Sequence, residues 1–208
     1  MRDPDPSFWD RIAKRYAKSG ISNQQAYEEK LAKTRQYLFP EANVLEIGCG
    51  TGTTALQHAP LVNHILATDL SANMLAIAKQ RAQDQSITNV TFEQRSVQRL
   101  DGGQDFDMVM AHSVLHLLPE PASAIRKAYD LLKPGGTFVS STACLGDNMR
   151  YLKPIVPIGR LLRLMPEVYF LTRTALVQAV VATGFSIEHE WQPAPKEALF
   201  LIARKPVT

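Results

Sequence analysis

The sequence predicts an α/β fold with a doubly wound, seven-stranded and mostly parallel sheet, N-terminal helices and one inserted segment. Short apolar runs alternate with helical stretches from residue 44 to residue 141. Two further apolar runs, at 185–191 and 198–203, are joined only by a loop. The alternating part implies right-handed βαβ crossovers, whereas the short connection implies an antiparallel strand at one edge of the sheet.

The first 40 residues predict two helices. Ser7 can cap the first helix. The stretch 23–39 is rich in Gln, Glu, Lys and Ala, which are good helix formers, and Pro40 closes it. We therefore expect residues 1–40 to form a helical cap on a single domain that spans residues 1–208.

The central part predicts five strands with helices between them. The run at 106–111 is almost continuously apolar, as expected of a strand that is buried on both faces. Ser71 is the expected cap of one helix, and another at 121–132 ends at the Lys-Pro-Gly-Gly run 133–136. The five strands are expected at 44–47, 65–69, 90–93, 106–111 and 137–141.

The alternation breaks between residues 142 and 171. More than half of residues 149–171 are apolar, prolines interrupt them, and the basic residues outnumber the one acid, Glu167. We expect residues 142–171 to form a lid that closes on an apolar ligand and makes transient contact with an anionic membrane surface. The alternative is an ordinary cap helix with a solvated basic face. A helix at 173–183 follows, and Gly184 is its expected C-cap.

Length and composition fit a globular enzyme. The chain has 208 residues, and domains usually span about 100–200. Its 23 Lys and Arg against 20 Asp and Glu give a net charge of +3, too small an excess to predict a nucleic-acid partner. Cys49 and Cys144 form neither a disulfide framework nor a zinc motif. We find no signal peptide and no run of about 18 apolar residues, so we expect a cytoplasmic protein.

The run EIGCGTG at residues 46–52 is the main functional signal. Its glycines let the backbone turn sharply off the first strand and approach a ligand. Thr53 stands where a dinucleotide site has its third glycine, which disfavours an NAD-dependent oxidoreductase. Glu46 would repel a pyrophosphate but suits an ammonium group, and Asp69 is placed to accept from two ribose hydroxyls. A ligand with a ribose, a positive amine and no phosphate is S-adenosyl-L-methionine.

The chain resembles the class I S-adenosylmethionine-dependent methyltransferases, in the group that includes ubiquinone/menaquinone-biosynthesis-type enzymes. The resemblance covers residues 40–140 closely. It rests on four segments in order: VLEIGCGTG at 44–52, ATDLS at 67–71, FDMV at 106–109 and LLKPGG at 131–136. It implies a Rossmann-like methyltransferase that uses S-adenosyl-L-methionine and releases S-adenosyl-L-homocysteine.

The resemblance also implies roles for individual residues. The backbone of residues 48–50 would line the methionine part of the cofactor, Asp69 would hold the ribose, and Leu70 and Met74 would enclose the adenine. The family commonly has Gly-Asp-Ala after the third strand, but residues 95–97 read Arg-Ser-Val here, so a serine replaces the charged contact. The expected cofactor-binding residues are Tyr16, Glu46, Gly48, Cys49, Gly50, Asp69, Leu70, Met74, Ser96, Val97 and His112.

The expected catalytic residues are His116 and Tyr16. The Leu-His-Leu run at 115–117 resembles the position of a proton-accepting histidine in phosphoethanolamine-type methyltransferases, where it works beside a tyrosine of the N-terminal helix. The alternative is that both side chains only pack against apolar neighbours. Positioning alone can supply about 7–11 kcal/mol, so a base is needed only where the acceptor must lose a proton.

These features predict methyl transfer to an O, N or C nucleophile on a small lipophilic acceptor by in-line displacement. No carboxylate lies between Ala111 and Leu118, so we expect no metal. The Asn-Pro-Pro or Asp-Pro-Pro tetrad of the usual adenine methyltransferases is absent after the fourth strand. A protein or RNA methyltransferase and a non-catalytic S-adenosylmethionine-binding protein stay open as alternatives, and the sequence leaves the oligomeric state open.

Overall fold

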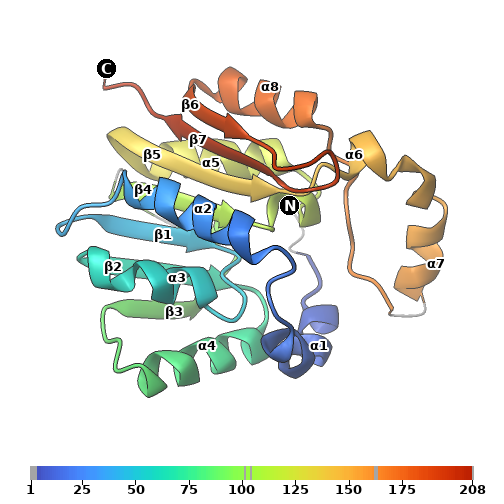
Figure 1. Ribbon diagram of the computed structural model, residues 1–208, viewed down its shortest axis with the longest axis horizontal. Coiled ribbons are helices and arrows are strands. Elements are labelled where there is room, and N and C mark those ends of the chain that lie inside the picture. Colours follow the sequence, from blue (N-terminus) through green and yellow to red (C-terminus); the bar gives the residue numbers. More distant parts are fainter. Residues whose placement is uncertain (1–3, 101, 104, 162–163, 208) are drawn as a thin grey trace.

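A seven-stranded sheet forms the centre of the protein, with helices on both faces (Figure 1). The computed structural model describes residues 4–100, 102–103, 105–161 and 164–207. The strand order is β3-β2-β1-β4-β5-β7-β6. The strands are β1 (Asn43–Ile47), β2 (His64–Asp69), β3 (Val90–Gln94), β4 (Phe106–His112), β5 (Leu132–Thr142), β6 (Ser186–Trp191) and β7 (Leu199–Arg204).

The pairing of the strands confirms the predicted fold class. The strands β3, β2, β1, β4 and β5 pair in parallel. The last strand, β7, inserts between β5 and β6 and is antiparallel to both. The order reverses between β1 and β4, and open α/β sheets bind ligands at such a switch point, outside the carboxyl ends of the strands.

The helices begin and end largely where local signals place them. The Ser71 side chain accepts from the Met74 N–H, and Gly184 takes a left-handed conformation at the end of its helix, so both caps are confirmed. The described helices are α1 (Ser7–Lys18), α2 (Gln24–Arg35), α3 (Thr53–His58), α4 (Ala72–Asp84), α5 (Pro121–Leu131), α6 (Leu145–Asn148), α7 (Ile155–Leu161) and α8 (Arg173–Thr183), with short 3-10 turns η1 (Ala59–Leu61), η2 (Val97–Arg99), η3 (Leu115–Leu117) and η4 (Arg150–Leu152).

The N-terminal cap differs from the prediction. Pro6 occupies the cap position of α1, and Ser7 is the first helical residue. The Asp5 carboxylate accepts from both the backbone N–H and the hydroxyl of Ser7, each at 2.9 Å. The expected cap at Ser7 is therefore wrong, because the carboxylate two residues earlier reaches the orphan N–H at the start of the helix.

Two apolar cores cover the two faces of the sheet. Val109 and Ala111 of β4 pack on one face together with helices α5 and α8. Met108 and Met110 of the same strand pack on the other face together with α3 and α4. All four of these side chains are almost fully buried. This confirms that β4 is buried on both faces, as its continuous apolar sequence predicts.

The strand β5 begins earlier than predicted. Phe106 of β4 pairs with Leu132, whereas Met108 pairs with Thr137, so the chain bulges between these two pairs. The bulge is held by the C-terminal segment, because the Gly135 N–H donates to the Lys205 carbonyl at 3.1 Å. Helix α5 ends at Leu131, just before the Lys-Pro-Gly-Gly run as expected, but this run lies within β5, which begins at Leu132.

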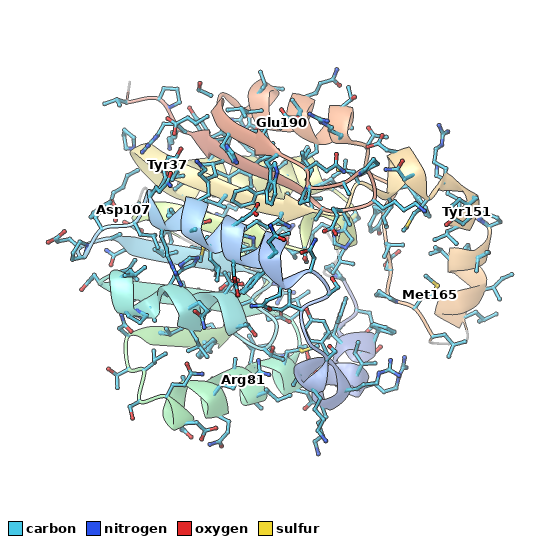
Figure 2. The ribbon with its side chains drawn as sticks, viewed as in Figure 1. Tyr37, Arg81, Asp107, Tyr151, Met165 and Glu190 are labelled. Atoms are coloured by element: carbon cyan, nitrogen blue, oxygen red, sulfur yellow. The ribbon has the colours of Figure 1, made fainter. Side chains whose placement is uncertain are left out.

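Within the segment 142–171, the described residues around α7 project from the rest of the domain (Figure 1), whereas Cys144 near its start packs in one of the two cores. Figure 1 shows α7 at one side of the molecule, away from the sheet, and Figure 2 marks Tyr151 and Met165 on this projecting part. Its far end returns to the core, where the Tyr169 N–H donates to the His116 carbonyl at 2.8 Å. Among the described residues, no helix has the length and apolar character that a membrane span needs.

Candidate active site

A cavity of about 690 Å³ lies at the carboxyl ends of β1, β2 and β4. This volume is within the range of about 300–1,000 Å³ that ligand pockets occupy. Its walls come from α1, α2, the glycine-rich loop, the segments after β2, β3 and β4, and the β6–β7 loop. The structure brings all the predicted cofactor-binding residues to this cavity: Tyr16, Glu46, Gly48, Cys49, Gly50, Asp69, Leu70, Met74, Ser96, Val97 and His112.

The glycine-rich loop is packed tightly at Gly48 and open at Gly50. Gly48 has a φ of +68°, and a Cβ atom there would lie 2.6 Å from Cγ2 of Val114. A Cβ atom on Gly50 would meet nothing within 4 Å, so this residue borders open space in the cavity. The loop backbone can therefore approach a ligand closely at Gly50, as a cofactor loop requires.

Asp69 connects the end of β2 to the glycine-rich loop. The Gly50 N–H donates to Oδ2 of Asp69 and the Ser71 N–H donates to Oδ1, both at 2.8 Å. Burial raises the pKa of Asp69, although these two hydrogen bonds oppose that effect. Each carboxylate oxygen retains a lone pair that can accept from a ligand hydroxyl.

Glu46 is the most deeply buried carboxylate that lines the cavity. Its side chain accepts from the Ala55 backbone at the start of α3, and its residue is only 2% exposed. Oε2 has no partner among the described residues, and burial raises the pKa of Glu46 to about 8, with the Asp69 charge adding to the effect. A buried acceptor of this kind needs a donor. An ammonium group would supply both the N–H and the compensating charge.

A third polar group of the cavity is a hydroxyl beyond Asp69. The Ser96 hydroxyl is buried and has no partner among the described residues. The apolar side chains of Leu70, Met74 and Val97 line the same part of the cavity. These groups fit the three parts of S-adenosylmethionine. The Glu46 carboxylate suits its ammonium group, the Asp69 carboxylate suits its ribose, and the Ser96 hydroxyl among apolar side chains suits its adenine.

The helix α1 is fixed over the cavity by contacts that the sequence did not predict. Asp10 accepts from the Ser71 hydroxyl at 2.6 Å and from the Asn73 N–H at 3.0 Å, so it joins α1 to the start of α4. Arg81, marked in Figure 2, donates to Oγ1 of Thr51 at 2.8 Å and to the Ala17 carbonyl at 2.8 Å. Arg81 therefore holds both the glycine-rich loop and α1, the helix that covers the cavity.

Of the two predicted catalytic residues, one lines the cavity and the other lies outside its described lining. Tyr16 lines the cavity from α1, and burial together with the charges of Asp69 and Glu46 raises the pKa of its phenol. His116 lies outside the cavity lining formed by the described residues. Burial lowers the pKa of His116 to about 4, and Nδ1 has no partner within the part of the chain that the structure describes. Its catalytic role stays a prediction.

The end of the cavity over β4 and β5 contains residues that sequence reasoning missed. Lys30 of α2 donates from Nζ to the Ser141 hydroxyl at 3.1 Å. His112 lies beside them, and burial lowers its pKa to about 3, with the charges of His58 and Lys30 contributing. A sequence signal for Lys30 was available, because it interrupts the buried face formed by Ala26, Leu31 and Thr34 of α2.

The described residues of the predicted lid do not line this cavity. The lining includes no described residue of the segment 142–171, although it includes Lys196, Glu197 and Ala198 of the β6–β7 loop. The two N-terminal helices do contribute, through residues such as Trp9 and Tyr27. The lid function of residues 142–171 stays a prediction.

The chain matches a family model described as "Methyltransferase domain" over residues 38–179, which is more than half of its length. It belongs to this methyltransferase family. The family match confirms the predicted class of S-adenosylmethionine-dependent methyltransferases and S-adenosyl-L-methionine as the cofactor. The residues of the cavity fit this cofactor, as their unpaired acceptors indicate.

Similar proteins agree with the methyltransferase assignment. A ubiquinone biosynthesis O-methyltransferase of Acinetobacter baumannii (strain ACICU) is 32% identical over 127 residues, which are 60% of this chain and 53% of that protein. The chain thus spans about half the length of the curated relatives it matches. An S-adenosylmethionine-dependent methyltransferase from Mesorhizobium loti has a TM-score of 0.71 and 22% identity, over 88% of this chain and 99% of that one.

The same fold also occurs in a protein named for another reaction. The [4+2]-cyclase SpnF has a TM-score of 0.75 and 19% identity, over 92% of this chain and 86% of that one. At such low identity these structural likenesses show the fold alone. The chemistry of a methyltransferase depends on its own cavity and not on the fold alone.

Proposed function

We propose that this methyltransferase transfers the methyl group of S-adenosylmethionine to an oxygen nucleophile on a small, largely apolar acceptor. The observation that carries the proposal is that one cavity is lined both by the orphaned Glu46 carboxylate and by Lys30 and His112. The similarity to proteins named ubiquinone biosynthesis O-methyltransferases supports oxygen over nitrogen or carbon as the attacked atom.

The residues that would hold the cofactor follow from their chemistry. Glu46 would accept from the ammonium group, Asp69 from the ribose hydroxyls, and the Ser96 hydroxyl from the adenine amine, between the apolar side chains of Leu70 and Met74. When bound, the cofactor supplies a methyl group on a sulfonium, which passes to an acceptor lone pair while the carbon–sulfur electron pair stays on sulfur.

The chain itself contributes positioning and shielding from water. The helix α1 lies over the cofactor end, where Asp10 and Arg81 hold it, and Tyr16 reaches the cavity from this helix. The raised pKa of Tyr16 keeps its phenol neutral, so it can donate a hydrogen bond or present its ring to a positive charge. His112 is neutral as well and lines the acceptor end. Well-oriented reactants need little further acceleration from side chains.

The projecting segment 142–171 would bring the protein to an apolar acceptor in a membrane surface. Its apolar side chains are strongly exposed, with Ile158 at 61% and Leu161 at 83%. The basic side chains of Arg150 and Lys153 are exposed on the same segment. An apolar surface with basic residues suits the boundary of an anionic membrane. Residues of this segment would then act as a lid only after movement toward the cavity.

Thermal unfolding with S-adenosylhomocysteine, S-adenosylmethionine and NAD, in separate samples, tests the cofactor assignment. A ligand at a hundred times its dissociation constant adds about 2.7 kcal/mol. In a domain of this size, that corresponds to an increase in Tm of roughly 5–11 °C. We expect this increase with the two adenosyl ligands and none with NAD. No increase with either adenosyl ligand at millimolar concentration would contradict the proposal.

Transfer of a labelled methyl group to a panel of alkyl-substituted phenols, amines and enols tests the reaction itself. We expect incorporation into phenols, and incorporation into amines alone would contradict the choice of oxygen. Cofactor binding without transfer to any member of the panel would favour a non-methylating activity, for which the fold similarity to a cyclase gives a precedent.

A further inference from the structure

The acceptor end of the cavity contains a partly buried cation. Lys30 lies on the face of α2 that packs toward the sheet, and its Nζ donates to the Ser141 hydroxyl at 3.1 Å. Ser141 is 6% exposed and lies near the end of β5, where it pairs in register with His112 of β4. The ammonium group is therefore fixed over the carboxyl ends of two neighbouring strands, inside the cavity.

The charge of Lys30 is poorly compensated. An ammonium group has three N–H donors, and within the described residues Nζ makes one hydrogen bond, to the neutral Ser141 hydroxyl, and no ion pair. Burial lowers the pKa of Lys30, and the charge of Glu197 opposes this. The Glu197 carboxylate is itself engaged by the Asn23 amide at 3.0 Å. A partly desolvated cation with unused donors favours an anion.

A second polar group at this end is also unpaired. Nε2 of His112 is buried and has no partner among the residues that the structure describes. His112 and Lys30 both line the cavity, and the Lys30 charge acts on the His112 ring. A neutral imidazole beside an ammonium group gives a ligand oxygen two distinct hydrogen-bonding partners.

The position of Lys30 separates it from the cofactor end. Glu46 lies on β1, Ser141 lies on β5, and β4 runs between these two strands. Neighbouring strands are about 4.8 Å apart, so β5 lies about 10 Å from β1 across the sheet. A group bound by Lys30 would therefore lie beyond the ammonium site at Glu46, on the side of the cavity that remains for the acceptor.

We propose that Lys30 and Ser141 form an anion-binding subsite that takes an ionised oxygen, either a phenolate or a carboxylate. The position over β5 favours the acceptor as the molecule that carries this ionised oxygen. The cofactor, through its carboxylate, is the other molecule that could supply it. This inference rests on the proposed function and narrows its substrate class. Bound next to Lys30, an acidic hydroxyl is held in its ionised form, so transfer would require no base in the protein. Amines are disfavoured there by charge.

Three variants test the subsite. Lys30→Met removes the charge and keeps the length of the side chain, whereas Lys30→Arg keeps the charge. Lys33→Met is the matched control, because Lys33 lies on the same helix and outside the cavity lining of the described residues. Binding of para-nitrophenol is followed by the absorbance of its ionised form, and para-nitroanisole serves as a probe of similar shape that cannot ionise. Calorimetry compares S-adenosylhomocysteine with methylthioadenosine, which lacks the carboxylate.

For an acceptor subsite, Lys30→Met weakens nitrophenolate binding by at least about tenfold, since a charge-assisted hydrogen bond is lost. Binding of nitroanisole and of S-adenosylhomocysteine then stays within about twofold of the wild type. The bound nitrophenol ionises about one pH unit lower than in solution, and Lys30→Met abolishes this shift while Lys30→Arg retains it. If the cofactor is the source, Lys30→Met weakens S-adenosylhomocysteine but not methylthioadenosine.

The subsite is refuted if Lys30→Met leaves both anionic ligands unchanged, or if it weakens nitroanisole as much as nitrophenolate. It is equally refuted if the wild-type protein binds no nitrophenolate and Lys30→Met does not alter binding of S-adenosylhomocysteine. Failure of the proposed function gives a different result, because the wild-type protein would then bind neither S-adenosylhomocysteine nor S-adenosylmethionine.

Discussion

The substitution Glu46→Gln tests the cofactor end of the cavity, because it should change stability and ligand binding in opposite directions. Glu46 is 2% exposed and lines the cavity, and its Oε2 has no partner among the described residues. Glutamine keeps the shape of the side chain and removes its titration. The variant therefore separates the role of the charge from the role of packing.

The expected size of the stability effect follows from the shifted pKa. Burial raises the pKa of Glu46 from 4.5 to about 8, so folding disfavours the ionised carboxylate. At about 1.4 kcal/mol for each pKa unit, this difference lowers the free energy of unfolding by about 5 kcal/mol at pH values above the pKa of the folded protein. The favourable contribution of the protonated form is complete below the ordinary pKa and is lost as the pH rises toward 8. The wild-type protein therefore becomes less stable across this window.

Urea unfolding at about pH 5 and at about pH 9 measures this effect. We expect Glu46→Gln to be within about 1 kcal/mol of the wild type at the lower pH and more stable than it by a few kcal/mol, up to about 4, at the higher pH. Calorimetry should show S-adenosylhomocysteine binding at least about tenfold more weakly, because its ammonium group loses a charged partner. Glu28→Gln, on the exposed side of α2, is the control.

Two results would refute the reasoning about Glu46. If the variant and the wild type lose stability in parallel as the pH rises, Glu46 does not titrate in this window. If S-adenosylhomocysteine binds both proteins equally, the buried carboxylate is not the ammonium site. The second result would leave the fold and the family assignment intact, and it would exclude Glu46 from the proposed site.

Four other predictions address the loop, its anchor, the catalytic candidates and the projecting segment. Gly48→Ala should lower the free energy of unfolding by about 1–3 kcal/mol and Tm by about 2–4 °C per kcal/mol, because the new Cβ meets Val114 at 2.6 Å and φ is positive, whereas Gly103→Ala, which meets nothing, should leave Tm unchanged in calorimetry. Arg81→Met should cost about 1–3 kcal/mol in urea unfolding and weaken S-adenosylhomocysteine binding, since it frees α1 from the loop; unchanged binding would show that the cover is dispensable. Tyr16→Phe and His116→Gln should each slow methyl transfer by about ten- to a hundredfold at unchanged Tm, as the predicted catalytic pair requires; a loss of less than about threefold with His116→Gln would exclude His116 from catalysis, in keeping with its place outside the cavity lining of the described residues. The pair Ile158→Asp and Leu161→Asp should abolish sedimentation with anionic phosphatidylglycerol vesicles without changing Tm, and equal sedimentation of wild type and variant would contradict membrane contact.

Most of the fold could be predicted because its signals are local. The glycines after β1, the cap at Ser71 and the left-handed Gly184 act within a few residues of themselves in the chain. The continuous apolar sequence of β4 predicts a strand between two cores without knowledge of its neighbours. Three local details were wrong or missing: the cap of α1 at Ser7, the early start of β5 at Leu132, and the six-residue helix α3, which is too short to show a period of its own.

Part of the site was also predictable, because several of its residues lie where a parallel strand ends. Glu46, Asp69 and His112 each follow or end a parallel strand, and parallel strands present their carboxyl ends at one edge of the sheet. Across that edge the order is Asp69 on β2, Glu46 on β1 and His112 on β4, because the strand order reverses between β1 and β4. In the structure, all three residues line the same cavity.

The sequence by itself determined the parallel sheet, the glycine-rich loop and the carboxylates that flank it, because spacing within about five residues controls turns, caps and strand ends. Only the tertiary structure decided which distant residues meet. Lys30 reaches Ser141 across 111 residues and Arg81 reaches Ala17 across 64, and His116 lies outside the cavity lining of the described residues although it follows the same strand as His112. Such contacts depend on how whole helices pack against the sheet, which no local spacing encodes.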